Sequence, residues 1–311
     1  MTGFVLRRLV WILPNVLLLT FLLFAVVTGW LGSPAGMMLG TDASPEAVAA
    51  LDRRYGFDQP IWRQYIAWVG AALGGDFGRS YATQQTVASM IAPAAPVTLE
   101  LSAWAILLAL VTAVGLNSLT VGRQAIGTVT SALSVIGVTI PNFMLGASLV
   151  YLFSVHLGWL PTTGWVPWSE GVGTHLRHLI MPVLTLFAFY FGSFTMIYRA
   201  EYRAVQRQLF VRVAAAKGLS DTRVSFRHVL PNAILPVVTY VGISAGHLIG
   251  GAVVTETVFS IPGLGRLFVS AIGAYDFPVM LAMGMIVLAG VTVTNLAADM
   301  ILAAINPQIR L

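Results

Sequence analysis

The sequence predicts an all-α fold, a bundle of helices that crosses a membrane several times. Only 9% of the 311 residues are charged and 57% are hydrophobic, which is far from the composition of soluble domains. A helix needs roughly 20 apolar residues to cross the hydrocarbon core of a bilayer. Six runs have about that length or more, at residues 9–30, 97–121, 128–156, 179–198, 233–255 and 278–304. We therefore expect one transmembrane domain over residues 1–311 with six spans.

Composition also argues against other classes of protein. The formal net charge is +5, but the basic residues fall between apolar runs instead of on one solvated face, so we expect no nucleic acid partner. The chain has no cysteine, which excludes disulfides and cysteine metal sites. Arg7 and Arg8 precede an apolar run, as in a signal peptide. That run is longer than a usual signal core and lacks a convincing cleavage site, so we expect an uncleaved first span.

The distribution of positive charge predicts how the spans are oriented. Six spans place both termini on one side, and that side carries eleven of the seventeen Lys and Arg residues, seven of them within 199–229. Cytoplasmic loops of membrane proteins carry the excess of Lys and Arg. We therefore expect a multi-pass protein of the plasma or inner membrane with both termini cytoplasmic. A cytoplasmic loop covers 199–230, and a long external loop covers 31–96.

The loop at 31–96 is too long to be a simple connection, and its sequence predicts two helices. Ser44 supplies an N-cap, Pro45 suits the first helical position and Gly56 ends the first helix. The second helix starts at Pro60 and carries an apolar face rich in aromatic residues: Ile61, Trp62, Tyr65, Trp68 and Val69. Such a face suits the membrane interface, and it suits packing against the protein's own spans equally well.

Inside the spans, proline and glycine predict local departures from a simple helix. Pro141 and Pro182 are expected to kink their helices, which membrane proteins tolerate when neighbouring groups satisfy the freed carbonyls. Gly242, Gly246 and Gly250 recur every four residues, and small residues at this spacing let two helices approach closely. We therefore expect these three glycines to be helix-packing positions in the fifth span.

The cytoplasmic loop predicts two short helices joined by a turn. An apolar stripe of Val205, Leu209, Val213 and Ala216 suggests a helix at 205–218 that Gly218 ends. Ser220 or Asp221 can cap a second helix, which Pro231 would close before the fifth span. The outward faces would carry Arg203, Arg207, Arg212, Lys217, Arg223 and Arg227. These charges suit a cytoplasmic partner, or they only set topology and attract anionic lipid.

The spacing of this loop is similar to the cytoplasmic loop of permeases from binding-protein-dependent ABC importers, with the pattern E-A-A-x₃-G-x₉-I-x-L-P. Ala214, Gly218, Leu230 and Pro231 match it, whereas Arg212, Val213 and His228 replace its Glu, first Ala and Ile. These departures resemble the peptide branch of the family, with "FVRVAAAKGLS" close to its "YVRTARAKGLS" and "RHVLPNAILPV" close to its "RHALRNALIPV". Further similar stretches are "YGFDQPIWRQY", "GDFGRS", "PVTLEL", "IPNF", "TETVFSIPGLGRL" and "NPQIRL". The chain thus resembles a dipeptide, oligopeptide or nickel-type ABC importer permease, the subunit type with a long first external loop.

The resemblance implies a type I ABC importer permease fold and a set of partners. These are a homologous second permease, two cytoplasmic ATPase subunits and an external substrate-binding protein. The lipid bilayer surrounds the two permeases. The only lysine, Lys217, is followed by glycine, so this chain has no P-loop, and ATP and Mg²⁺ would bind on the partners. The chain itself would be no enzyme and would need no cofactor. The resemblance assigns ATPase coupling to Arg212, Ala214, Ala215, Ala216, Lys217, Gly218, Leu219, Ser220 and Asp221.

Two other functions compete on single features. Ser244 lies in a G-x-S-x-G sequence beside His247, as in a serine hydrolase, which would suggest a rhomboid-like protease. Four ionisable groups at or near membrane depth would suit an ion-coupled secondary transporter: Glu100, Glu256, Asp299 and His247. The simpler interpretation is that Glu100 and Glu256 sit at outer span ends facing water and Asp299 sits near the inner end.

For the translocation pathway, we expect Glu256 to be the leading substrate residue, with Asn295 and Asp299 as lesser candidates. Glu256 ends the glycine-rich fifth span and precedes a segment broken by proline and glycine, which could fold back as a gate. His175 and His178 have the wrong spacing for a helical metal pair, so no metal site is expected. The sequence leaves the substrate open among peptides, nickel chelates, glutathione and other small solutes.

Overall fold

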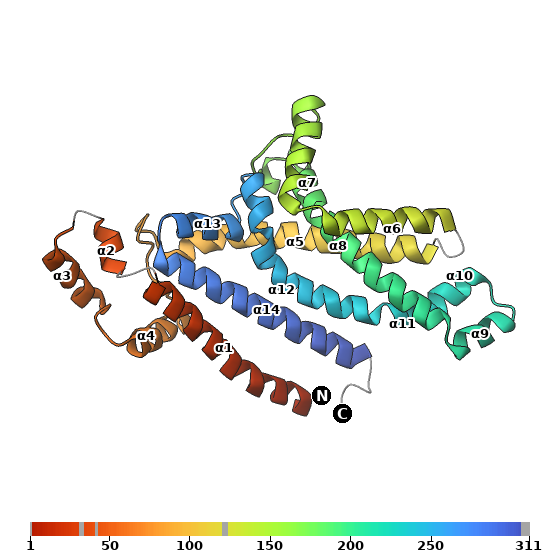
Figure 1. Cartoon of the computed structure of the whole chain (residues 1–311), viewed down its shortest axis with the longest axis horizontal. Coiled ribbons are helices and arrows are strands. Elements are labelled where there is room, and N and C mark those ends of the chain that lie inside the picture. Colours follow the sequence, from red (N-terminus) through yellow and green to blue (C-terminus); the bar gives the residue numbers. More distant parts are fainter. Residues whose placement is uncertain (1, 31–33, 41–42, 120–123, 306–311) are drawn as a thin grey trace. The chain divides into compact units, whose positions relative to one another are not determined.

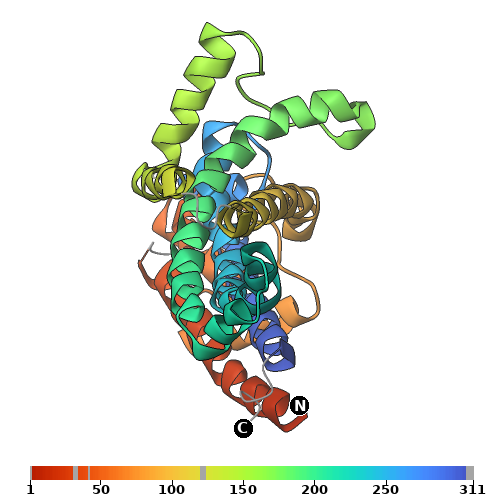
Figure 2. The same ribbon diagram turned by 90° about the vertical axis from the view of Figure 1, so that its right-hand side faces the viewer.

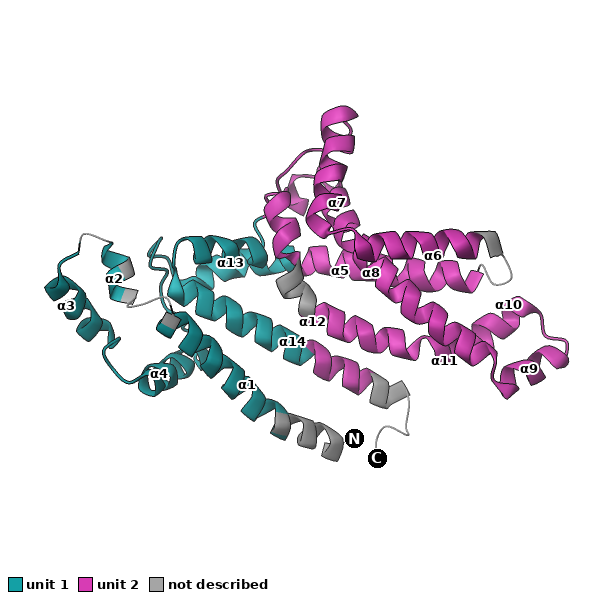
Figure 3. Ribbon diagram, in the orientation of Figure 1, with its two compact units in different colours: residues 1–98, 262–293 teal, residues 99–261, 294–311 magenta. Residues whose placement is uncertain are grey.

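The computed structural model describes residues 2–30, 34–40, 43–119 and 124–305. Within these ranges every extended regular element is a helix, and the single β-bridge joins Arg79 to Thr86 (Figure 1). The predicted all-α class is therefore confirmed. The chain divides into two compact units, which Figure 3 colours separately. Unit 1 holds residues 1–98 and 262–293, and unit 2 holds residues 99–261 and 294–311.

Unit 1 contains a long first helix, three short helices after it, the start of the second long helix and two helices from the C-terminal third. They are α1 (Thr2–Trp30), α2 (Pro34–Leu39), α3 (Pro45–Tyr55), α4 (Ile61–Leu73), the start of α5 (Val87–Leu119), α13 (Leu264–Gly273) and the first part of α14 (Phe277–Ile305). Helices α1 and α14 approach closely where Gly284 faces Leu23, since a Cβ added at Gly284 would overlap the Leu23 side chain. Glycine at this position therefore lets the two long helices pack together.

The two helices expected between the first and second spans are present. Ser44 caps α3, because its hydroxyl oxygen accepts a hydrogen bond from the Ala47 N–H at 3.2 Å. Gly56 ends α3 with a φ of 74°, in the left-handed region that favours glycine. Helix α4 begins directly after Pro60. Local capping signals alone were therefore sufficient to place both helices.

The aromatic face of α4 is divided between two environments. The Tyr65 hydroxyl donates to the Leu17 carbonyl at 2.9 Å, and the Trp68 ring lies 5.7 Å from that of Phe24. Both contacts are with α1, so this half of the face packs on the protein's own first span. Trp62, by contrast, is 52% exposed. Packing against the protein therefore accounts for Tyr65 and Trp68, and the interface hypothesis remains for Trp62.

Unit 2 is built around one long helix. Its elements are the rest of α5, α6 (Gln124–Thr139), α7 (Asn142–Leu149), the π-helix η1 (Val150–His156), the 3₁₀ turn η2 (Trp168–Glu170), α8 (Val172–Gln206), α9 (Leu209–Ala216), α10 (Asp221–Val224), the π-helix η3 (Ser225–Val229), α11 (Leu230–Ala233), α12 (Leu235–Val258) and the end of α14. Helix α8 contacts α6, α7, α11 and α12 (Figure 1 and Figure 2). It remains one helix across Pro182.

Glycines allow close helix contacts in unit 2 at expected and unexpected places. A Cβ added at Gly242 of α12 would overlap Ala298 of α14. Gly246 is buried, whereas the surroundings of Gly250 lie outside the described residues. Sequence reasoning missed Gly137 of α6 and Gly192 of α8, where an added Cβ would overlap the facing helix's backbone. Neither of them has a second glycine four residues away in the sequence, which was the pattern that identified the first set.

The candidate spans number four, or up to six if each bent helix pair counts as one span, among the residues that the structure describes. The four straight ones are Ile12–Gly29, Val87–Leu119, Val172–Gln206 and Phe277–Ile301. The expected span at 128–156 is instead two helices that meet at 106°. Pro141 lies at this break. A proline disfavours helical geometry in the residue before it, which explains why the helix is interrupted there. The kink predicted at Pro141 is therefore a sharp bend.

Candidate functional site

The basic segment, residues 199–233, has the expected arrangement of two short helical stretches joined by a turn. Helix α8 runs on to Gln206, α9 follows after a break at Arg207 and Gln208, and a turn at Gly218 leads into α10. The N–H of Gly218 donates to the Ala215 carbonyl at 2.9 Å, and its φ is +81°. Apart from its two neighbours in the chain, no atom of the described residues lies within 4 Å of a Cβ added there. A side chain at this position would therefore strain the backbone without a clash inside this chain.

The apolar stripe predicted for a helix at 205–218 is wrong. Leu209 is 74% exposed, and Val213 and Ala216 are also exposed. The buried residues of α9 are instead Val211 and Ala214. The physical reason is the break before Leu209, which starts a new helix with a new direction and so removes the phase that linked Val205 to the stripe.

The predicted role of Pro231 is also wrong. Instead of closing the second helix, Pro231 lies in the first turn of α11, where its missing N–H costs no helical hydrogen bond. The helical path runs from Asp221 to Ala233 and then bends by 47° into α12. The bend falls at Ile234, two residues before Pro236, which lies at the start of α12.

The outer surface of the basic segment combines charge with exposed apolar side chains. All six outward basic residues predicted from the sequence are exposed: Arg203, Arg207, Arg212, Lys217, Arg223 and Arg227. Leu209, Phe210 and Val213 of α9 lie exposed among them. We call α9 and the turn to Asp221 the basic face.

A buried group of hydroxyls joins the basic segment to two long helices. We call Ser118, Tyr198, Tyr202 and Ser225 the hydroxyl cluster. The Tyr198 hydroxyl lies 2.5 Å from Ser118 Oγ, linking α8 to α5. The Tyr202 hydroxyl donates to Ser225 Oγ at 2.9 Å, and Ser225 Oγ lies 3.4 Å from the Ser118 carbonyl oxygen. All four side chains are buried. The cluster therefore connects η3 of the basic segment to α5 and α8.

Sequence reasoning missed the hydroxyl cluster. The one available signal was the spacing of Tyr198 and Tyr202, four residues apart and so on one face of α8. A further link is Arg199, whose guanidinium donates to the Gly127 carbonyl and, at 2.9 Å, to Thr130 Oγ1. Arg199 therefore ties α8 to α6, unlike the exposed basic residues that follow it.

Glu256 does not face water, as the simpler interpretation expected, because it is 0% exposed. It lies within the last turn of α12, and its carbonyl accepts a hydrogen bond from the Ile261 N–H at 2.8 Å. The Phe259 carbonyl accepts from the Gly164 N–H at 2.8 Å, so the segment at 157–171 is tied to this turn. The backbone of Glu256 therefore closes a turn directly after α12, and its side chain is buried there.

The other pathway candidates lie on α14. Asn295 and Asp299 are both partly buried there, and Asp299 directly follows Ala298, the residue in contact with Gly242 of α12. The structure therefore places Asp299 beside the helix that carries Glu256. After the turn at 259–263, the chain forms the short apolar helix α13 (Leu264–Gly273).

Glu100 also differs from the expected water-facing carboxylate. It accepts a hydrogen bond from Trp168 Nε1 at 2.8 Å and lies 3.0 Å from His175 Nε2. His175 is 1% exposed, and its Nδ1 lies 2.6 Å from the Val166 carbonyl oxygen. Both ring nitrogens of His175 therefore face oxygen acceptors. The Trp168 ring stacks on His175 at 3.8 Å, so this cluster fixes the segment at 157–171.

The features that suggested other chemistry are not arranged for it. The Nδ1 of His178 lies 2.9 Å from the Thr174 carbonyl oxygen, so His175 and His178 bond in separate places. Ser244 is buried inside the continuous helix α12, whereas a serine nucleophile needs an exposed position on a sharp turn. The side chain of His247 lies outside the described residues.

Comparison with known proteins accounts for nearly the whole chain. Residues 105–311 match the family described as binding-protein-dependent transport system inner membrane component, and residues 1–102 match the N-terminal region of such components. The chain belongs to this family. The glutathione transport system permease protein GsiC of Salmonella typhi is 36% identical, over 100% of this chain and 99% of that protein. GsiC of Escherichia coli (strain K12) is 34% identical with the same coverage.

Family membership decides between the functions that the sequence left open. The chain is a multi-pass membrane permease subunit of an ABC importer, and it works with ATPase and binding-protein partners. It is a transport component and no enzyme, and ATP binds to the partner ATPases. The secondary transporter and the rhomboid-like protease are therefore both wrong for this chain.

Proposed function

We propose that this permease imports a short peptide of about the size of glutathione. Support comes from GsiC of Salmonella typhi and Escherichia coli, which are named as glutathione transport permeases and match this chain over its full length. The chain forms half of the translocation pathway and pairs with a homologous second permease. Two ATPase subunits bind on the cytoplasmic side and a substrate-binding protein delivers the peptide from outside.

The orientation belongs to this proposal. Both termini and the basic segment lie in the cytoplasm, and residues 31–96 lie outside the plasma or inner membrane. The support is the excess of Lys and Arg on the side of the termini, eleven of seventeen residues. In this orientation Glu256, Asn295 and Asp299 belong to the translocation pathway, with the buried Glu256 as the main contact for substrate.

The basic face docks on an ATPase subunit and receives its movement. The observation that carries this assignment is the exposure of Leu209, Phe210 and Val213 on α9, beside Arg212 and Lys217. Adjacent exposed apolar side chains on one surface mark a contact with another protein. The coupling residues are Arg212, Ala214, Ala215, Ala216, Lys217, Gly218, Leu219, Ser220 and Asp221, of which Ala214 is buried and positions α9 on this chain.

The test is a double variant, Arg212→Glu with Gly218→Leu, in the assembled importer. Charge reversal and a bulky side chain in a left-handed turn should disturb the docked surface. We expect normal membrane insertion and ATP hydrolysis that no longer drives uptake, measured as the ratio of substrate imported to ATP hydrolysed. Arg203→Glu, an exposed change on α8, is the charge-matched control. Unchanged coupled uptake in the double variant would contradict the proposed docking.

A further inference from the structure

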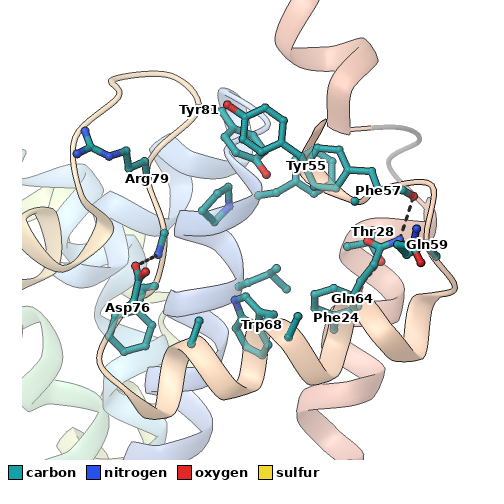
Figure 4. Close-up of a pocket in the computed structure, with 18 of the residues that line it drawn as sticks. Phe24, Thr28, Tyr55, Phe57, Gln59, Gln64, Trp68, Asp76, Arg79 and Tyr81 are labelled. Atoms are coloured by element: carbon teal, nitrogen blue, oxygen red, sulfur yellow. Dashed lines mark hydrogen bonds between the residues drawn. The ribbon is translucent and has the colours of Figure 1, made fainter. Parts of the chain in front are cut away.

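Unit 1 contains a cavity of about 600 Å³ that none of the assigned functions uses. It lies between the end of α1, helix α4, the turn at 56–59, the segment at 76–84 and the start of α14 (Figure 4). Sites for small molecules commonly enclose about 300–1,000 Å³, so this cavity has the size of a ligand site.

The walls of the cavity are rich in aromatic rings. The rings come from elements far apart in the chain: Phe24, Tyr55, Phe57, Trp68, Phe77, Tyr81 and Phe277. Tyr55 and Phe57 stack with their centroids 5.7 Å apart, and Phe57 meets Tyr81 edge-on at 6.4 Å. The Nε1 of Trp68 is buried and has no hydrogen-bond partner within the described part of the chain. Such walls favour an aromatic or branched apolar group and include a donor that lacks an acceptor.

Neutral, acidic and basic polar side chains also line the cavity. They are Gln59, Arg63, Gln64, Asp76, Arg79 and Gln84. Figure 4 shows Asp76 and Arg79 on one side of the cavity and Gln59 and Gln64 on the other. Asp76 and Arg79 are exposed, and both side chains bond to backbone groups: Asp76 accepts from the Gly78 N–H at 2.9 Å, and Arg79 donates to the Gln84 carbonyl at 3.2 Å. Their charges therefore remain open to a ligand.

Buried hydrogen bonds hold the cavity in shape. Asp276, which is 2% exposed, accepts hydrogen bonds from the Ser80 hydroxyl and, at 3.0 Å, from the Tyr81 N–H. This fastens the segment at 78–84 to the start of α14. The Gln64 amide donates to the carbonyls of Phe57, at 3.0 Å, and Gln59, at 2.7 Å, which fixes the turn at 56–59. A cavity whose walls are held before binding loses little entropy when a ligand enters.

The hydroxyl of Tyr81 is kept in its neutral form. Burial raises the pKa of this phenol well above its usual range, and the nearby Tyr55 and Asp276 raise it further. Tyr81 can therefore donate a hydrogen bond at any physiological pH.

We propose that this cavity binds a short zwitterionic peptide with an aromatic or branched apolar side chain. A free peptide brings an ammonium group for Asp76 and a carboxylate for Arg79 or Arg63. Its side chain fits among the rings. A lipid acyl chain would contact the rings alone and would not use the exposed charges of Asp76 and Arg79. The inference rests on the proposed function, because it needs peptides outside the membrane and residues 31–96 exposed there.

The test is binding of the dipeptide Ala-Phe to the assembled importer in lipid nanodiscs without its binding protein. Ligand-observed NMR reports transfer of magnetisation to the phenyl ring, and titration gives the Kd. We expect Asp76→Asn and Arg79→Gln to weaken binding about tenfold each, the loss expected for one charge-assisted hydrogen bond. C-terminally amidated Ala-Phe should bind the wild-type protein about tenfold more weakly. Arg53→Gln, an exposed change on α3 outside the cavity, should have no effect.

Equal binding by Asp76→Asn, Arg79→Gln and wild-type protein would overturn the inference, and so would equal binding of amidated and free Ala-Phe. Retention of the dipeptide signal only in lipid-free detergent would show that lipid fills the cavity and would also overturn it. If the wild-type importer does not bind Ala-Phe in the cavity but still takes up peptide with ATP, only this inference is wrong. Intact cavity binding with uptake that does not depend on ATP removes the proposed function alone.

Discussion

Glu256 shows how far the environment of one residue can differ from the environment that its position in the sequence predicts. Its place at the end of an apolar run suggested a carboxylate in water, but its side chain is fully buried. A carboxyl group is costly to bury at membrane depth and is retained where it serves a function. Glu100 is partly buried, and its partners Trp168 and His175 indicate a structural role.

At the residue scale, we predict that Glu256→Gln lowers uptake at least about tenfold while leaving insertion and ATPase activity intact. The amide keeps the size of the side chain and removes its charge, so the fold should tolerate it. Uptake and ATP hydrolysis measured on the same vesicles separate the two effects. Glu170→Gln, an exposed change in the segment at 157–171, is the control. Full uptake by Glu256→Gln would exclude a role of the charge in the pathway.

At the scale of elements, the hydroxyl cluster is the physical link between the basic segment and the spans. The chain has an exposed apolar and basic surface on α9, where we propose docking, and buried hydrogen bonds that connect η3 to α5 and α8. Small residues and the turn at Gly218 shape the surface, whereas Tyr198 and Tyr202 make the joint rigid. A movement of the basic face would therefore reach the long helices through this cluster.

We predict that Tyr202→Phe weakens this joint by about 1 kcal/mol, because it removes one buried hydrogen bond and leaves the ring in place. The expected result is a lower ratio of substrate imported to ATP hydrolysed with an unchanged basal ATPase rate. Tyr151→Phe removes a hydroxyl from an exposed ring of η1 and serves as the matched control. If both variants couple equally well, the cluster plays no part in transmission.

At the scale of the whole molecule, the distribution of charge determines the orientation in the membrane. The chain has no cysteine, so single cysteines can be introduced without a background signal. We predict that a membrane-impermeant maleimide labels Asp58→Cys on intact cells and labels Gln206→Cys only after the membrane is opened. Both positions are exposed in the structure. The reverse labelling pattern would overturn the proposed topology, because the positive-inside rule would then fail for this chain.

Much of the architecture could be predicted because its causes are local in the chain. Ser44 and Gly56 bound α3, Pro60 starts α4, and Gly218 marks the turn of the basic segment. The same reasoning failed at α9, where a break before Leu209 changed the buried face from the predicted stripe to Val211 and Ala214. Periodicity predicts a face only as long as the helix is continuous.

The sequence by itself determined the class of the protein, the positions of the long helices and the charge asymmetry, because apolar length, capping residues and the placement of Lys and Arg are properties of short stretches. Only the tertiary structure decided that Glu256 is enclosed, that Ser225 meets Tyr202 and that Asp276 shapes a cavity. Asp276 and Ser80 are 196 residues apart in the chain. Contacts over such separations depend on how helices pack, which no local pattern records.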